Sequence, residues 1–211
     1  MKKLTILIAL VLLGACSPKK NSVKSNVSAT IAGVPLGTAC AAGSSQQKIG
    51  YIYDSSAQSS NFETRAKAML SSYLQPSEVG SISGRQGDTT GIGFTGTVKL
   101  DANGAVVPAQ TNVKITVYDS TWLYNQTADN LIEMNFNTAK GSIMSGQFNP
   151  TTGVGFLSLA DSYGEIRFEG TIDAQKLSGN VTFANKTTVV GGTPASGALG
   201  QFWVNRCAFL Q

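Results

Sequence analysis

Hydrophobic and polar residues alternate with a period of two over most of the chain after residue 90. Side chains two residues apart on a β-strand share a face, so this pattern predicts strands with one buried and one exposed side. The clearest predicted strands span residues 94–100, 113–118, 132–137, 165–173 and 177–183. Less regular ones span residues 49–53, 142–148, 154–160 and 199–209.

One segment before residue 90 has the period of an α-helix instead. Ser60-Asn61-Phe62-Glu63 has the form of a capping box, and apolar residues then recur at helical spacing until Pro76. The apolar positions are Phe62, Ala66, Met69, Leu70 and Tyr73. The spacing predicts one amphipathic helix of about thirteen residues, whose apolar stripe packs on the sheet.

The connections between the predicted strands are short and rich in turn residues. Examples are Asn149-Pro150-Thr151-Thr152-Gly153 and Asp161-Ser162-Tyr163-Gly164. Such connections join antiparallel neighbours, because a parallel pair needs a crossover of a dozen or more residues. We therefore predict a mainly β fold, an antiparallel meander of about eight strands that forms an up-and-down β-barrel, with a β-sandwich as the alternative. A transmembrane barrel also alternates, but the aromatic content of 8% disfavours it.

Composition and charge narrow the class of protein. The 211-residue chain has no histidine, which excludes Ser-His-Asp and Cys-His catalysis and histidine-containing zinc sites. Five of the 16 lysines and arginines precede residue 25. The rest of the chain has the other 11 and all 12 aspartates and glutamates, so its net charge is −1. A nucleic-acid partner is therefore not expected. Glu165, Arg167 and Glu169 form the one dense charge cluster, which is predicted to be a self-neutralising surface ladder on one strand. No catalytic residue, metal or cofactor is expected, and we predict a protein that is not an enzyme.

The N-terminal residues are typical of a targeting signal. Two lysines precede a ten-residue apolar run, Leu4 to Leu13, which is too short to span a bilayer and is followed by Gly14-Ala15-Cys16. This stretch resembles the type II signal peptide and lipobox of bacterial lipoproteins. The resemblance implies that residues 1–15 are removed and that acyl chains on Cys16 anchor the protein to a membrane. An ordinary secretory signal with an incidental cysteine is the alternative.

The lipoprotein resemblance also implies a domain organisation and a location. Residues 16–26 have no apolar periodicity and are expected to form the lipidated cysteine and a flexible tether, followed by a single β domain over residues 27–211. Ser17 stands where many lipoproteins of the inner membrane carry aspartate. We therefore expect an outer-membrane lipoprotein that faces the periplasm or the cell surface.

Cys40 and Cys207 are the two cysteines that remain after Cys16. An even pair in an oxidising compartment predicts a disulfide. It would join the beginning of the β domain to its last strand. Two buried free thiols are the alternative.

Binding residues are expected in the longer loops, because loops on a rigid β scaffold tend to carry function. Trp122 and Tyr124 are the predicted ligand or partner contacts, and folding back as a plug is their alternative role. Trp203 is expected to fill the core. The leading functional hypothesis is a cell-envelope lipoprotein whose non-enzymatic barrel binds a small apolar ligand or an envelope partner. The alternative is a structural or interaction lipoprotein with a filled core and no ligand.

Overall fold

A long antiparallel sheet forms most of the protein. The computed structural model describes residues 30–32, 34–35, 49–54, 59–73, 91–118, 132–186 and 193–211. The strands are β1 (Thr30–Ile31), β2 (Val34–Pro35), β3 (Gly50–Tyr53), β4 (Gly91–Thr97), β5 (Asn112–Tyr118), β6 (Ile132–Phe136), β7 (Ile143–Phe148), β8 (Val154–Ala160), β9 (Gly164–Ile172), β10 (Lys176–Asn185) and β11 (Ser196–Asn205). The helices are α1 (Ser59–Leu70) and α4 (Arg206–Phe209), with 3-10 turns η1 (Pro108–Gln110) and η3 (Thr138–Lys140).

The predicted signal peptide, Cys16 with its tether, Cys40, Trp122 and Tyr124 lie outside the described residues.

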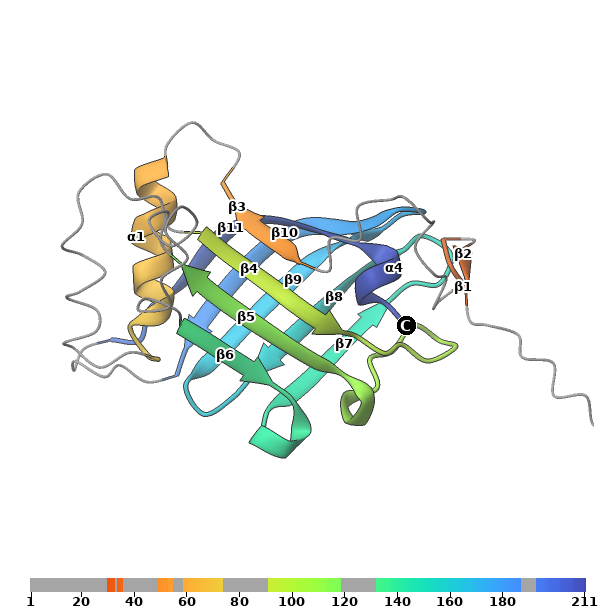
Figure 1. Cartoon of the computed structure of the whole chain (residues 1–211), viewed down its shortest axis with the longest axis horizontal. Coiled ribbons are helices and arrows are strands. Elements are labelled where there is room, and N and C mark those ends of the chain that lie inside the picture. Colours follow the sequence, from red (N-terminus) through yellow and green to blue (C-terminus); the bar gives the residue numbers. More distant parts are fainter. Residues whose placement is uncertain are drawn as a thin grey trace, which may run out of the picture.

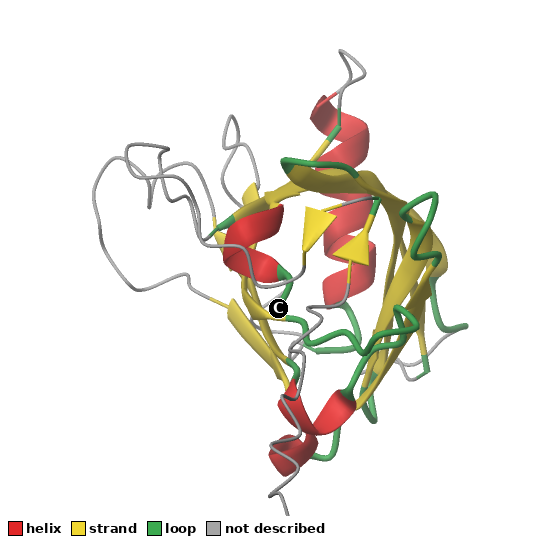
Figure 2. Cartoon of the chain, turned by 90° about the vertical axis from the view of Figure 1, so that its right-hand side faces the viewer, coloured by secondary structure: helices red, strands yellow, loops and turns green. Residues whose placement is uncertain are grey.

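Nine strands form one antiparallel sheet that curves round a common axis and is nearly closed into a barrel (Figure 1, Figure 2). Their order is β6-β5-β4-β3-β11-β10-β9-β8-β7. Faces alternate as predicted: on β5, Val113, Ile115 and Val117 point inwards and are at most 3% exposed. The mainly β, antiparallel barrel fold with one amphipathic helix is therefore confirmed. The strand predicted over residues 49–53 is β3, which pairs with both β4 and β11.

The middle of the barrel is filled by phenylalanine rings. Phe94 on β4 and Phe168 on β9 are separated by three strands in the sheet, yet their ring centroids are 5.1 Å apart. Phe202 on β11 and Phe209 on α4 complete the cluster, with centroids 6.1 and 5.3 Å from that of Phe94. All four rings are at most 2% exposed. Burial of each ring contributes about 1.5–3 kcal/mol, so this cluster is a main source of the barrel's stability.

α1 lies at one end of the barrel and packs against β11 and β10 (Figure 1). Its predicted apolar stripe is buried: Phe62, Ala66, Met69 and Leu70 are at most 7% exposed. Arg65 of the same helix also forms a hydrogen bond with the sheet.

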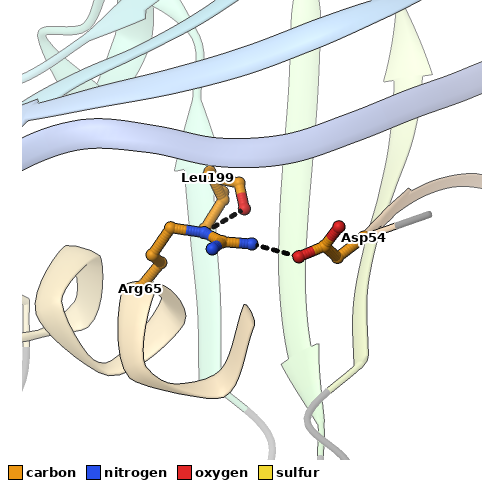
Figure 3. A network of polar contacts seen from close by, with 3 residues as sticks. All are labelled: Asp54, Arg65 and Leu199. Atoms are coloured by element: carbon orange, nitrogen blue, oxygen red, sulfur yellow. Dashed lines mark hydrogen bonds and ion pairs between the residues drawn. The ribbon is translucent and has the colours of Figure 1, made fainter. Parts of the chain in front are cut away.

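Arg65 joins α1 to two strands at once (Figure 3). Its Nε donates a hydrogen bond to the carbonyl oxygen of Leu199 on β11 at 3.0 Å, and its terminal nitrogen forms an ion pair of 2.5 Å with Asp54 just after β3. The helix ends at Leu70, earlier than the predicted stop at Pro76. Ser71 and Ser72 follow it, and their hydroxyls donate to carbonyl oxygens three residues earlier, which competes with continued helix.

The opposite end of the barrel carries α4 and the β1–β2 pair, which face the viewer in Figure 2. Arg206, only 4% exposed, donates from one guanidinium nitrogen to the carbonyl oxygens of Ile31 and Asp173, both at 2.9 Å. Burial lowers the pKa of Arg206 below its ordinary value, and the charge of Asp173 opposes this shift. The prediction of a strand as far as residue 209 is wrong for its last residues, because the chain turns inwards at Arg206 to form α4.

Trp203 does not fill the core, contrary to expectation. Its neighbours Phe202 and Val204 point into the barrel and are at most 1% exposed, so Trp203 faces outwards. There its ring lies 5.7 Å from that of Tyr51, which it opposes in the β3–β11 pair. An unbroken apolar run hides the alternation here, and the pairing register decides which residue points inwards.

Candidate binding site at the barrel seam

Among the described residues β6 and β7 do not pair with each other, and we call the region where β6 ends and β7 begins the seam. Every neighbouring pair in the nine-strand order is antiparallel. Strand direction therefore alternates, and the first and last strands of an odd number run the same way, as β6 and β7 do in Figure 1. They could pair only as parallel strands, but residues 137–142 between them are too few for a parallel crossover. β7 follows β6 along the barrel instead of lying beside it, because residues 104–107 lie between the continuation of β4 and β7 as β5 lies between β4 and β6.

The chain itself fills one half of the seam. Val106 donates its N–H to the carbonyl oxygen of Gly146 at 3.0 Å, and Phe148 donates to Gly104 at 2.9 Å. Ala105 lies between them as an antiparallel bridge partner of Gln147. The loop after β4 thereby adds a short strand to the C-terminal half of β7. β8 pairs with the whole of β7, and on the other edge, beside residues 143–145, no described strand is bridged to it.

A cleft of about 610 Å³ lies at the seam, between β6 and the β8–β9 turn. Its volume is in the range of small-molecule and peptide side-chain sites, roughly 300–1,000 Å³. Four segments line it: Tyr73 after α1, residues 133–135 on β6, residues 140–142 before β7, and residues 161–163 between β8 and β9. The lining combines two tyrosine rings with charged, amide and hydroxyl groups.

Tyr73, Asp161 and Tyr163 form the end wall of the cleft. The Tyr73 hydroxyl donates to Oδ1 of Asp161 at 3.4 Å, and the two tyrosine ring centroids are 5.4 Å apart. The same Oδ1 accepts the main-chain N–H groups of Tyr163 at 2.8 Å and Gly164 at 3.0 Å. The carboxylate is therefore held in place by its own turn. Because these residues come from separate elements, the wall also fixes α1 to the β8–β9 turn.

Electrostatics keep Tyr73 a neutral hydrogen-bond donor. Burial, and then the charge and hydrogen bond of Asp161, raise the pKa of Tyr73 well above its ordinary value. At the rim, Nζ of Lys186 donates to the carbonyl oxygen of Asp161 at 2.7 Å, and Lys114 forms a 2.9 Å ion pair with Glu133. These groups are suited to hold a ligand by ring contacts and hydrogen bonds.

Sequence reasoning did not identify this site. Of the predicted site residues, Cys207 lies in α4, whereas Cys16, Cys40, Trp122 and Tyr124 lie outside the described residues. The sequence does show the turn that contains Asp161 and the helix stripe that ends at Tyr73. Neither pattern indicates that these two residues, 88 positions apart, meet.

The charge cluster on β9 is a surface ladder, as predicted. Nε of Arg167 donates to Glu169 at 2.6 Å, and its guanidinium carbon lies 3.8 Å from the centroid of the Phe156 ring. Glu165 accepts a 2.6 Å hydrogen bond from the Ser158 hydroxyl. The two carboxylates are thus engaged separately. Within the described ranges, no cluster of three or more His, Cys, Asp or Glu is placed to hold a metal ion.

The chain matches no family model, no curated protein and no solved structure. None of the helices in the described segments is both long enough and apolar enough to cross a membrane.

Proposed function

We propose that this chain is a lipid-anchored protein of the bacterial cell envelope, that its barrel is a filled, non-enzymatic scaffold, and that it binds an envelope partner at the seam. The observation that carries the proposal is the contact between Phe94 and Phe168 across the barrel, at 5.1 Å between centroids. Rings that meet across the middle occupy the space that a ligand inside a hollow barrel would need. Under this proposal the partner binds at the surface cleft between β6 and the β8–β9 turn.

The second candidate function is carriage of a small apolar ligand inside the barrel. It would require the phenylalanine cluster to separate and to lose its buried contacts, which argues against it. The mixed lining of the cleft, with Asp161, Glu133 and Lys140, also suits a polar partner better than an acyl chain. A filled interaction scaffold is thus the better supported of the two.

Anchoring rests on the N-terminal sequence, in which Cys16 ends the lipobox-like stretch. Two or three acyl chains hold a protein firmly at a membrane, since each buried methylene contributes about 0.8 kcal/mol. Under this proposal the mature chain starts at Cys16 and is attached to the outer membrane.

We also infer that Cys40 and Cys207 form a disulfide. Support comes from the sequence: the expected acylation of Cys16 leaves Cys40 and Cys207, which lies in α4, as an even pair in an oxidising compartment. The bond would close a loop of well over a hundred residues between the two ends of the domain. In the chain-entropy picture such a loop contributes roughly 5 kcal/mol of stability.

Membrane fractionation tests the anchor. Cys16→Ser should move the protein from the membrane to the soluble fraction, whereas the matched variant Ser17→Ala should stay with the membrane. A Cys16→Ser protein that remains in the membrane fraction would refute lipid anchoring.

Mass spectrometry of the full-length protein, purified in detergent, separates scaffold from carrier. The denatured chain should show acyl groups on the mature N-terminus, and the native chain should show no further bound mass after the detergent is removed. A retained lipid in the native spectrum would favour ligand carriage over a filled scaffold.

A further inference from the structure

We propose that the barrel of the anchored protein lies against the lipid bilayer through its outer face at β3 and β11, which contacts the headgroup region. We call this surface the aromatic face, and it consists of Ile49, Tyr51, Tyr53 and Trp203. The inference rests on the proposed function, because it starts from the lipid anchor at Cys16. It goes beyond that function by assigning a second contact with the membrane, made by the folded barrel.

The side chains of the aromatic face project from one side of two paired strands. Tyr51 and Trp203 are directly opposite each other in the β3–β11 pair, and their ring centroids are 5.7 Å apart. Side chains alternate between the two faces of a strand, and Ile52 points into the barrel with 3% exposure. Ile49 and Tyr53 therefore point outwards, as Tyr51 does, and they are 43% and 40% exposed.

Pairing across the sheet explains the two central members of the face but not the two exposed ones. An aromatic pair on neighbouring strands stabilises a sheet by about 0.2–1 kcal/mol, which accounts for Tyr51 and Trp203. Tyr53 is opposite Gln201, and Ile49 precedes the first residue of β3. Both leave apolar surface in water beside the aromatic pair. Exposed apolar surface that gathers in one place is typical of contact with a membrane or a protein.

The absence of charge next to the aromatic pair favours a lipid surface. The row that crosses β4, β3, β11 and β10 at this level contains no charged side chain, since it consists of Gly93, Tyr51, Trp203 and Ser178. The first charged residue in the row beyond β4 is Glu133 on β6, which is paired with Lys114. The face can therefore approach headgroups without removing a charge from water.

Tryptophan and tyrosine are the residues that suit this position. Each has an apolar ring that can enter the boundary between headgroups and acyl chains, and one polar group that can stay in contact with water. Ile49 adds a purely apolar side chain at the margin of the face. The composition matches the interface of a bilayer better than its hydrocarbon interior, so the barrel lies on the membrane and does not enter it.

The chain that leads from Cys16 enters the barrel at the end of β11 that carries Trp203. Arg206, three residues after Trp203, donates to the carbonyl oxygen of Ile31 at 2.9 Å. α4 and the β1–β2 pair accordingly lie at the same end of the barrel (Figure 2). The 14 positions from Cys16 to Thr30 can reach at most about 50 Å. Acylation of Cys16 thus keeps the end of the barrel next to the aromatic face close to the membrane.

The sequence of the tether adds an electrostatic attraction. Residues 16–29 contain Lys19, Lys20 and Lys24 and no acidic residue. A lysine near an anionic membrane surface contributes about 1 kcal/mol of attraction. These lysines would hold the chain before β1 at the headgroups, and with it the end of β11. Acyl chains, lysines and the aromatic face then contact the membrane from one side of the molecule.

Quenching of tryptophan fluorescence by brominated lipid tests the proposal. The chain has two tryptophans, so Trp122→Phe leaves Trp203 as the only one. The acylated protein would be reconstituted in vesicles of phosphatidylethanolamine and phosphatidylglycerol, with and without phosphatidylcholine brominated at the headgroup end of its acyl chains. Emission from Trp203 should fall by about half in the brominated vesicles, because bromine quenches only rings at the depth of the interface.

A matched pair of variants in the Trp122→Phe protein tests the face itself. Ile49→Ser combined with Tyr53→Ser removes the exposed apolar surface beside Trp203, and bromine quenching should drop at least about threefold. The control, Ile143→Ser, removes an apolar side chain that is 68% exposed on β7, at the far end of the strand order, and should leave quenching unchanged. Circular dichroism would verify folding, and flotation with the vesicles would verify that both variants are anchored.

Three outcomes would overturn membrane contact by the aromatic face. They are equal Trp203 emission in brominated and plain vesicles, equal quenching in the two variants, and shielding of Trp203 from aqueous acrylamide that depends on protein concentration and occurs without bromine quenching. The last would mean that a second copy of the chain covers the face. In all three cases flotation shows that the anchor is intact, so the proposed function stands. A wild-type protein that does not float would refute the anchor and this inference together.

Discussion

β3 and β11 lie almost 150 residues apart in the chain and pair directly, whereas β6 and β7 are joined by residues 137–142 and do not pair. Closeness in sequence is therefore the wrong guide to where this barrel closes. At the β3–β11 junction the two strands run in opposite directions and can form an antiparallel ladder. At the seam β6 and β7 run in the same direction, and β7 follows β6 along the barrel instead of lying beside it.

The two regions also differ in what lies behind them. Behind the β3–β11 junction are the rings of Phe94, Phe202 and Phe209, and α1 is fixed to this side by Arg65. At the seam there is a cleft with a polar rim and the tyrosine end wall. We infer that stability is concentrated at the junction and that binding is concentrated at the seam.

The largest expected difference is between core truncations on the two sides. Phe202→Ala should reduce the free energy of unfolding by about 3–5 kcal/mol, because it opens a cavity in the phenylalanine cluster. Met134→Ala, whose side chain borders the cleft, should cost about 2 kcal/mol. Urea denaturation followed by circular dichroism measures both, provided that the slope is unchanged. Equal costs would show that the seam is packed as tightly as the junction.

The sequence predicts the elements of this protein better than their closure. The alternation over Val113, Ile115 and Val117 and the helical stripe of α1 depend on burial of one face, which a periodic pattern records directly. Strand number and pairing depend on a four-residue strand, β3, whose role is visible only from its partners. Trp203 is a second example, because the register of the β3–β11 pair decides whether its side chain points into the barrel or outwards.

The candidate site could not be predicted from the sequence, for a related reason. Its end wall joins Tyr73 to Asp161 across 88 positions, and the rest of its lining comes from β6 and the residues before β7. No local motif encodes either property. Predicted contacts at Trp122 and Tyr124 follow from loop length and composition, and they stay predictions.

An intermediate effect is expected from titration of Tyr73 in the seam wall. Its pKa is raised in the folded protein, so the unfolded chain loses this proton first, near pH 10. The neutral form's contribution to stability is present below that pH and is lost as the pH rises above it, by at most about 1.4 kcal/mol per pH unit. Urea denaturation from pH 8.5 to 11 should show this loss in the wild type and in Tyr163→Phe, and a shallower loss in Tyr73→Phe. Parallel curves for all three proteins would contradict the assigned burial of Tyr73.

The smallest expected effects separate the ion pairs of the two regions. The Arg65–Asp54 pair lies at the junction, with side chains 31% and 10% exposed, and the Lys114–Glu133 pair lies beside the seam, with side chains 39% and 36% exposed. Asp54→Asn should cost about 1 kcal/mol, whereas Glu133→Gln should cost only a few tenths of a kcal/mol. Raising the salt concentration from about 0.05 to 1 M should abolish the second cost, because exposed charges are screened, and should preserve most of the first. If high salt removes the stability cost of both substitutions, the Arg65–Asp54 pair behaves as an exposed pair and does not hold α1 against the sheet. The stability of the junction would then come from the phenylalanine cluster alone.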